Sequence, residues 1–258
     1  MKNRLTALFN KKDRRVLNIY CTAGYPQKEN MPEVIMALQE CGADIVEIGI
    51  PYSDPIADGP VIQQSNMTAL KNGMTLQLLF EQLHKIKMQV HIPVVLMGYL
   101  NPVMQYGIER FCEDAAAAGV SGIILPDMPM YEYERSYKKV FSKYKLSFIF
   151  LVTPQTSEER IKKADELSSG FLYAVSSSST TGSVVNTEEQ AVYFKRLNTL
   201  ELKNPVLIGF GIGDRETFDT ACEYAAGAIS GSAYIKALGM GKNIKTTTKA
   251  FIEMLTGG

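Results

Sequence analysis

The sequence has few of the side chains on which metal and disulfide sites depend. It contains two histidines and four cysteines, and no C-x-x-C pair or Cys/His cluster occurs among them. A disulfide framework or a structural zinc site is therefore not expected. Reduced thiols and a cytoplasmic location are the simplest interpretation of cysteines at positions 21, 41, 112 and 222.

An excess of charge of one sign and long apolar runs are also missing. Lys+Arg and Asp+Glu both number 27, so there is no surplus of positive charge to attract nucleic acid or anionic lipid. No stretch approaches the roughly 20 apolar residues that span a bilayer. The basic first nine residues predict a short amphipathic helix and not a secretion signal. We expect neither a nucleic-acid partner nor a membrane partner.

What is present is a regular alternation of short apolar runs with helical segments. The runs are apolar almost throughout, as expected for parallel strands that are covered on both faces. The expected strands are residues 16–22, 44–48, 93–97, 122–125, 147–152, 171–175, 206–210 and 227–230. Eight such units without a linker predict one α/β domain over residues 1–258, a (β/α)8 TIM barrel with an extra N-terminal helix and a short helix after strand eight. An open doubly wound sheet is the alternative, but no G-x-G-x-x-G follows the first strand.

Glu47 lies inside an apolar run, close to the C-terminal end of the second expected strand, where barrels of this type form their active sites. A core carboxylate neutralised by a distant salt bridge is the alternative, although no Lys or Arg occurs from residue 41 to residue 70. Burial disfavours the charged form and suits proton transfer near neutral pH. Asp58, in the following loop, is either a second functional carboxylate or only a turn former or helix N-cap.

Glycines gather after the last three strands. Thr181 and Gly182 follow strand six, Gly211 follows strand seven, and Gly231 and Ser232 open a short helix after strand eight. Glycine lets backbone N–H groups approach a ligand, and a helix N-terminus favours an anion. Each glycine alone could be a simple turn, but together they predict a phosphate ester as substrate.

Further absences narrow the chemistry. No expected strand contains a lysine, so a Schiff-base aldolase has no obvious nucleophile. His84 is expected in mid-helix and His91 before strand three, at the wrong end of a barrel for catalysis. No PLP or nicotinamide motif is present. Carboxylate acid–base chemistry on a phosphorylated small molecule remains, with no metal or cofactor held by this chain.

The run from Glu47 to Pro60, EIGIPYSDPIADGP, resembles the signature of tryptophan synthase α-subunits. Matching segments spread over nearly the whole chain, at residues 20–26, 99–102, 126–129, 181–182, 209–212 and 228–233. The resemblance implies cleavage of indole-3-glycerol phosphate into indole and glyceraldehyde 3-phosphate by a retro-aldol reaction in tryptophan biosynthesis.

The resemblance also implies residue roles. Glu47 would move the proton between the substrate's 3′-hydroxyl and indole C3, Asp58 would bind the indole N–H, and Tyr173 would orient Asp58. The indole pocket would be lined by Tyr20, Ile62 and Tyr99. The phosphate would be held by Thr181, Gly182, Gly211, Gly231 and Ser232.

The family works in an α2β2 complex, in which a PLP-dependent β-subunit receives indole. Residues 54–55, 101–105 and 126–130 would face that partner. Ser179 and Thr180 replace a glycine and a valine found in many relatives, within a stretch, residues 176–182, that we predict to close as a lid. Three alternatives stay open: a free-standing lyase, a non-catalytic activator of the β-subunit, and another phosphate-binding barrel such as an isomerase or aldolase.

Overall fold

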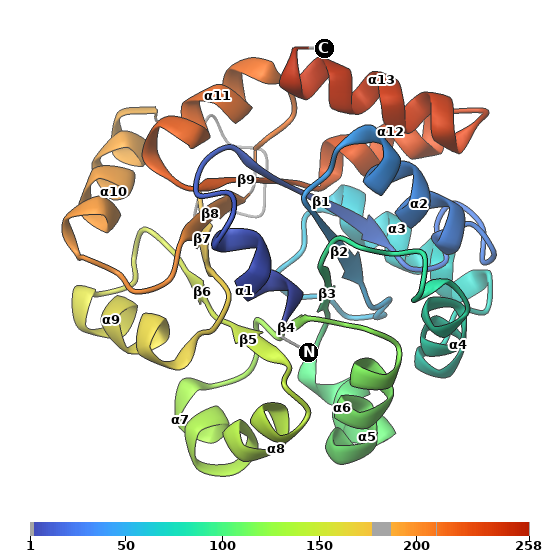
Figure 1. Ribbon diagram of the computed structural model, residues 1–258, viewed down its shortest axis with the longest axis horizontal. Coiled ribbons are helices and arrows are strands. Elements are labelled where there is room, and N and C mark those ends of the chain that lie inside the picture. The colour runs from blue at the N-terminus through green and yellow to red at the C-terminus, as the bar shows by residue number, and fades with distance from the viewer. Residues whose placement is uncertain (1–2, 177–186, 210, 258) are drawn as a thin grey trace.

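The computed structural model describes residues 3–176, 187–209 and 211–257. All its strands lie in one parallel sheet, in the order β5-β4-β3-β2-β1-β9-β8-β7-β6, and helices surround the sheet (Figure 1). The strands are β1 Val16–Thr22, β2 Ile45–Gly49, β3 Val94–Met97, β4 Gly122–Ile124, β5 Ser147–Ile149, β6 Leu151–Val152, β7 Leu172–Val175, β8 Val206–Gly209 and β9 Gly227–Ser230.

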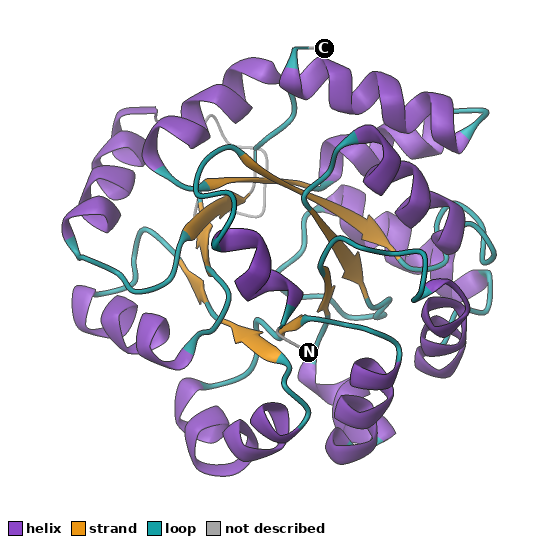
Figure 2. Cartoon of the chain, in the orientation of Figure 1, coloured by secondary structure: helices purple, strands orange, loops and turns teal. Residues whose placement is uncertain are grey.

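The strands are surrounded by helices, all of which lie in an outer layer except α1, at one end of the barrel (Figure 2). The helices are α1 Arg4–Phe9, α2 Met31–Cys41, α3 Pro60–Lys71, α4 Leu76–Ile86, α5 Leu100–Tyr106, α6 Ile108–Ala117, α7 Met130–Glu132, the π-helix η1 Tyr133–Tyr137, α8 Lys138–Lys143, α9 Glu158–Leu167, α10 Thr187–Thr199, α11 Arg215–Tyr224, α12 Ser232–Met240 and α13 Ile244–Thr256. None of the helices in the described ranges is long and apolar enough to cross a membrane.

The sheet closes on itself at Phe150. Strands β5 and β6 stand at the two ends of the sheet order, yet only this residue separates them along the chain. Its carbonyl accepts a hydrogen bond from the Tyr173 backbone N at 3.0 Å, which continues the pairing of β6 with β7. The predicted barrel is confirmed, and the strand expected over residues 147–152 is divided in two. The division arises because the Phe150 backbone N donates to the Ser168 side chain, at 3.0 Å, instead of to a neighbouring strand.

Strand periodicity sorts the core into two layers. Successive side chains of a strand point to opposite faces. In β1, Val16 and Tyr20 face the barrel interior, whereas Leu17 and Ile19 pack against the helices. In β2, the same alternation puts Glu47 in the interior with Ile45. Every residue of both strands is buried, which explains why their sequence is apolar nearly throughout.

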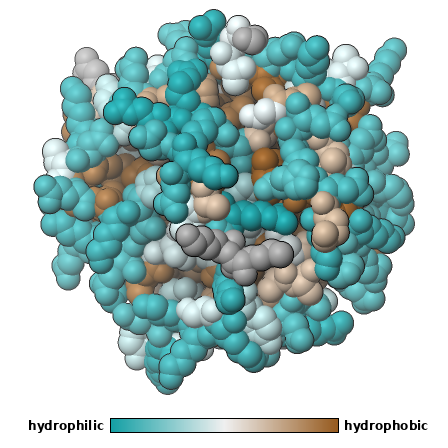
Figure 3. Space-filling model, viewed as in Figure 1, coloured by the Kyte–Doolittle hydropathy of each residue, from teal (hydrophilic) through white to brown (hydrophobic). Residues whose placement is uncertain are grey.

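Helix α1 closes one end of the barrel, as Figure 1 shows. Leu5 is fully buried in the inner layer. The Asn3 side-chain amide donates to the carbonyls of Ser121 and Lys145 at 2.8 and 3.0 Å, which fixes the start of the helix to the loops before β4 and β5. The face viewed in Figure 3, on which α1 lies, is mainly hydrophilic. The opposite end of the barrel, where the strands finish, is left for a site.

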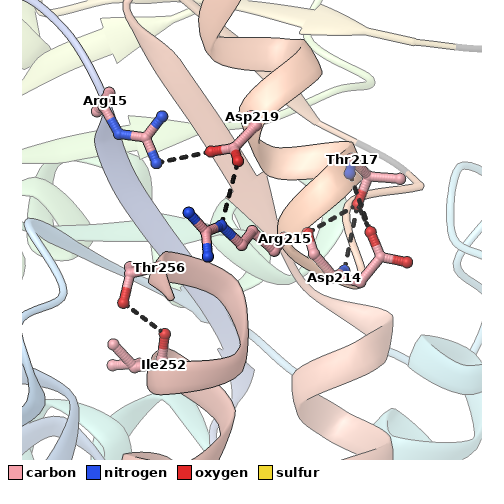
Figure 4. A network of polar contacts seen from close by, with 7 residues as sticks. All are labelled: Arg15, Asp214, Arg215, Thr217, Asp219, Ile252 and Thr256. Atoms are coloured by element: carbon pink, nitrogen blue, oxygen red, sulfur yellow. Dashed lines mark hydrogen bonds and ion pairs between the residues drawn. The ribbon is translucent and has the colours of Figure 1, made fainter. Parts of the chain in front are cut away.

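Polar contacts fix α11 beside the start of β1 (Figure 4). Asp219 accepts from the Arg15 guanidinium at 2.7 Å and from Arg215 Nε at 3.4 Å. At the first turn of α11, the Asp214 side chain accepts from the Thr217 backbone N at 2.9 Å in a capping box. Because the cap fixes the start of α11, it also fixes the loop between β8 and α11, part of which lines the candidate site.

Candidate active site

A cavity of about 290 Å³ lies at the C-terminal ends of the strands. The barrel brings residues from distant parts of the sequence to this one place. Eight residues predicted from the sequence line it: Tyr20, Glu47, Asp58, Ile62, Tyr173, Gly211, Gly231 and Ser232. Tyr99 lies close to Asp58 but does not line the cavity, and Thr181 and Gly182 fall outside the described residues.

Glu47 is fully buried in the barrel interior. Oε2 accepts a hydrogen bond from the Asn18 side-chain amide at 2.8 Å, and Oε1 has no hydrogen-bond partner among the described residues. Burial raises the pKa of Glu47 from 4.5 to about 8, against a lowering by the Asn18 hydrogen bond. No ion pair within the described residues includes Glu47, so the salt-bridged core carboxylate is not what the structure shows.

Asp58 lies in the loop between β2 and α3 and is nearly buried. It does not cap α3, because the N-cap is Gly59 and no side chain caps the helix. Burial raises the pKa of Asp58 from 3.8 to about 6, while hydrogen bonds with Tyr99 and Asn66 lower it. The Tyr99 hydroxyl also accepts from the Ala57 backbone N at 3.0 Å, so Tyr99 supports the loop that carries Asp58.

Two tyrosines occupy the space above glycines of neighbouring strands. A Cβ at Gly49 would overlap the hydroxyl of Tyr20, and a Cβ at Gly209 would overlap the hydroxyl of Tyr173. Only glycine leaves room for the two hydroxyls at these places. Burial raises the pKa of both tyrosines well above 10, and the neighbouring carboxylates Glu47 and Asp58 raise it further. Both phenols therefore stay neutral beside the two acids.

The other side of the cavity is built by the β8–α11 loop and by the N-terminus of α12. Gly211 and Gly213 line it from the loop, and the Ser230 hydroxyl fixes that loop by donating to the Ile212 carbonyl at 2.7 Å. Ser232 is the first residue of α12, where backbone N–H groups and the helix dipole favour an anion. Lys236 lies one turn further along α12 and also lines the cavity.

The arrangement places two carboxyl groups with different ionisation in one apolar cavity. At pH 7 a group with a pKa of about 8 is mainly protonated, whereas one with a pKa of about 6 is mainly ionised. Such a pair supplies an acid and a negative charge to the same substrate. Within the described residues no group of three or more His, Cys, Asp or Glu side chains could hold a metal ion.

Sequence reasoning missed three residues near these acids. Asn18 contacts Glu47, Asn66 donates to Asp58 Oδ2 at 3.5 Å, and Lys236 lines the cavity. Lys236 could have been found from its spacing, since it follows Ser232 by four residues and so lies on the same face of the helix. Asn18 could have been noticed as an amide within an apolar strand.

The chain is similar to known proteins over nearly its whole length. The model of the family described as tryptophan synthase alpha chain matches residues 6–256. The tryptophan synthase alpha chain of Christiangramia forsetii is 53% identical over 225 residues, which cover 87% of this chain and 88% of that protein. The one of Parabacteroides distasonis is 49% identical over 254 residues and 98% of each chain.

Solved structures are similar over nearly the whole chain. Tryptophan synthase subunit alpha from Legionella pneumophila superimposes with a TM-score of 0.90 at 32% identity, covering 100% of this chain and 98% of that one. A chain of the tryptophan synthase complex from Pyrococcus furiosus gives 0.87 at 33% identity, covering 96% of this chain and 100% of that one.

Proposed function

The chain belongs to the tryptophan synthase alpha chain family, and from this membership we propose how its cavity carries out the reaction. It is a lyase that cleaves indole-3-glycerol phosphate to indole and glyceraldehyde 3-phosphate in tryptophan biosynthesis. The observation that carries the assignment of residues is the pair of buried carboxyl groups, Glu47 and Asp58, in one cavity at the ends of the strands. We take residues 1–258 to act as one barrel domain.

The two halves of the cavity suit the two halves of the substrate. The indole ring would lie between Tyr20, Ile62 and the Asp58 loop, with Tyr99 behind Asp58. The phosphate would lie where the β8–α11 loop meets the first turn of α12, held by Gly211, Gly231 and Ser232. The family resemblance adds Thr181 and Gly182 to these phosphate-binding residues.

The different ionisation of the acids gives each a role. Protonated Glu47 donates its proton to indole C3, while ionised Asp58 accepts a hydrogen bond from the indole N–H and stabilises the positive charge that develops on the ring. Glu47, now a carboxylate, takes the proton of the 3′-hydroxyl. The bond between C3 and the glycerol carbon then breaks, the electron pair returns to the ring, and Glu47 ends protonated again. Tyr173 orients Asp58 in this scheme.

The end of the barrel that holds the cavity also carries large exposed side chains that a partner protein would cover. Ile56, Met104 and Tyr131 are exposed by 80%, 54% and 66%, and they lie in the segments after β2, β3 and β4. Contiguous apolar patches mark interaction surfaces, and these three segments follow adjacent strands of the sheet. We infer that these segments face a β-subunit in an α2β2 assembly. The PLP would belong to that subunit, with no cofactor in this chain and a cytoplasmic location for the complex.

The test is the reaction itself, measured with and without the β-subunit. The chain should form indole and glyceraldehyde 3-phosphate in equal amounts from indole-3-glycerol phosphate, slowly alone and faster with the partner. An equal rate in both conditions indicates a free-standing lyase. Absence of indole in both conditions contradicts the proposal and leaves the chain as a non-catalytic activator.

A further inference from the structure

Asn18 is an amide in a place that packing does not explain. It lies in β1 with no exposed surface, among the apolar side chains of the barrel interior. Its Oδ1 is buried and has no hydrogen-bond partner among the described residues. An unpaired buried acceptor opposes folding, so an apolar side chain of similar size would serve stability better. The contact that the amide does make is the one to Glu47.

That contact makes the two oxygens of Glu47 unequal. The Asn18 amide donates to Oε2 at 2.8 Å, across two adjacent strands, whereas Oε1 has no hydrogen-bond partner among the described residues. In a neutral carboxyl group the carbonyl oxygen accepts a hydrogen bond better than the hydroxyl oxygen does, so the Asn18 N–H favours Oε2 as the carbonyl oxygen. In the neutral acid the proton therefore sits on Oε1.

We propose that Asn18 is a positioning residue for the reaction: by holding Oε2 it assigns the exchangeable proton to Oε1 and fixes the orientation of the carboxyl group toward the substrate. The proposal rests on the proposed role of Glu47 in proton transfer. Asn18 itself touches no reacting atom, and it acts through the carboxyl group that it holds.

The surroundings of Glu47 predict what loss of the amide does to its titration. Asp58 from the β2–α3 loop raises the pKa of Glu47, and Glu47 in turn raises those of Tyr20 and Cys21 from β1 and of Tyr173 from β7. Lys236 of α12 lines the same cavity, and its side chain is exposed to solvent.

Burial and the charge of Asp58 both raise the pKa of Glu47, and the Asn18 amide opposes them. A hydrogen bond to the ionised form lowers a pKa, so removing the Asn18 amide must raise it further.

The experiment compares the wild-type chain with Asn18→Val, which removes the amide at similar size. The Glu47 carboxyl carbon is followed by ¹³C NMR without substrate and identified by the signal missing in Glu47→Gln. Loss of a hydrogen bond to a charged group should raise the midpoint of the Glu47 titration by about 1–2 pH units in Asn18→Val. The alkaline limb of the pH profile of kcat should move to higher pH with the Glu47 midpoint. At pH 7, kcat should fall by about tenfold with little change in KM, because the Glu47 carboxyl group is no longer held in one orientation toward the substrate.

Ile19→Val is the matched control, because Ile19 is the next residue of β1 and packs on the outer face against the helices. Ile19→Val should change neither the Glu47 titration nor the pH profile of kcat. If Asn18→Val does not fold, Asn18→Asp keeps the shape and replaces the donor by a second carboxyl group, which also raises the Glu47 midpoint.

An unchanged Glu47 titration in a folded Asn18 variant overturns the proposal. So does a lower kcat without any movement of the pH profile, since that is the result of a purely structural role. These results differ from failure of the proposed function, which would appear as near wild-type turnover in Glu47→Gln.

Discussion

Replacement of Glu47 by glutamine should stabilise the fold, and the gain should grow with pH. Glu47 is fully buried and its pKa is raised from 4.5 to about 8, chiefly by burial. Below pH 4.5 the carboxyl group is protonated in both the folded and the unfolded chain and does not affect stability. Between pH 4.5 and 8 the unfolded chain releases the proton and the folded chain keeps it. Stability is therefore lost progressively as the pH rises through this window.

The size of the effect follows from the two pKa values. At about 1.36 kcal/mol for each pH unit, the difference between 4.5 and about 8 corresponds to a total of about 5 kcal/mol. Between pH 5 and pH 8 the free energy of unfolding of Glu47→Gln should rise relative to wild type by about 3.5 kcal/mol. The raised pKa of Asp58 is present in both proteins and cancels to first order in this comparison.

Urea unfolding of the two proteins at pH 5, 6, 7 and 8 measures this difference. Glu113→Gln is the matched control, because it makes the same substitution at an exposed position on α6. A difference for Glu47→Gln that does not vary with pH would refute the reasoning, since it would mean that Glu47 is ionised in the folded protein at neutral pH.

Three further substitutions test other parts of the site. Asp58→Asn removes the charge that stabilises the developing cation, and steady-state kinetics should show kcat lower by about 10²-fold with a small change in KM. Gly49→Ala places a Cβ against the Tyr20 hydroxyl, and urea unfolding should show a loss of about 1–3 kcal/mol together with a higher KM. Ser232→Ala removes a hydroxyl donor at the start of α12 and should raise KM and the inhibition constant of glycerol phosphate about tenfold at constant kcat.

The barrel could be predicted because its strands are covered on both faces and read as unbroken apolar runs. The strands expected over residues 16–22 and 227–230 match β1 and β9 to the residue, and the ends of the others differ from the observed strands by at most one residue within the described ranges. The division at Phe150 could not be predicted, since it depends on the Ser168 side chain, 18 residues away in sequence. Local sequence does not specify such a partner.

Glu47 could be singled out because a charge in an apolar run is conspicuous, whereas Asp58, in a loop, received its role only from the resemblance of residues 47–60 to the family signature. The contact between Asn18 and Glu47 could not, because the two residues are 29 positions apart and meet only through the register of β1 with β2. The lid predicted over residues 176–182 and the phosphate contacts of Thr181 and Gly182 fall almost entirely outside the described residues and stay predictions.

The central claim is that Glu47 moves the proton on which carbon–carbon cleavage depends. Its most direct test is the rate of indole release from indole-3-glycerol phosphate by the wild-type chain and by Glu47→Gln, with Glu113→Gln as control. Loss of the acid assigned to protonate C3 should lower kcat by at least about 10²-fold in Glu47→Gln, while Glu113→Gln keeps the wild-type rate. Turnover near the wild-type value in Glu47→Gln would contradict the mechanism.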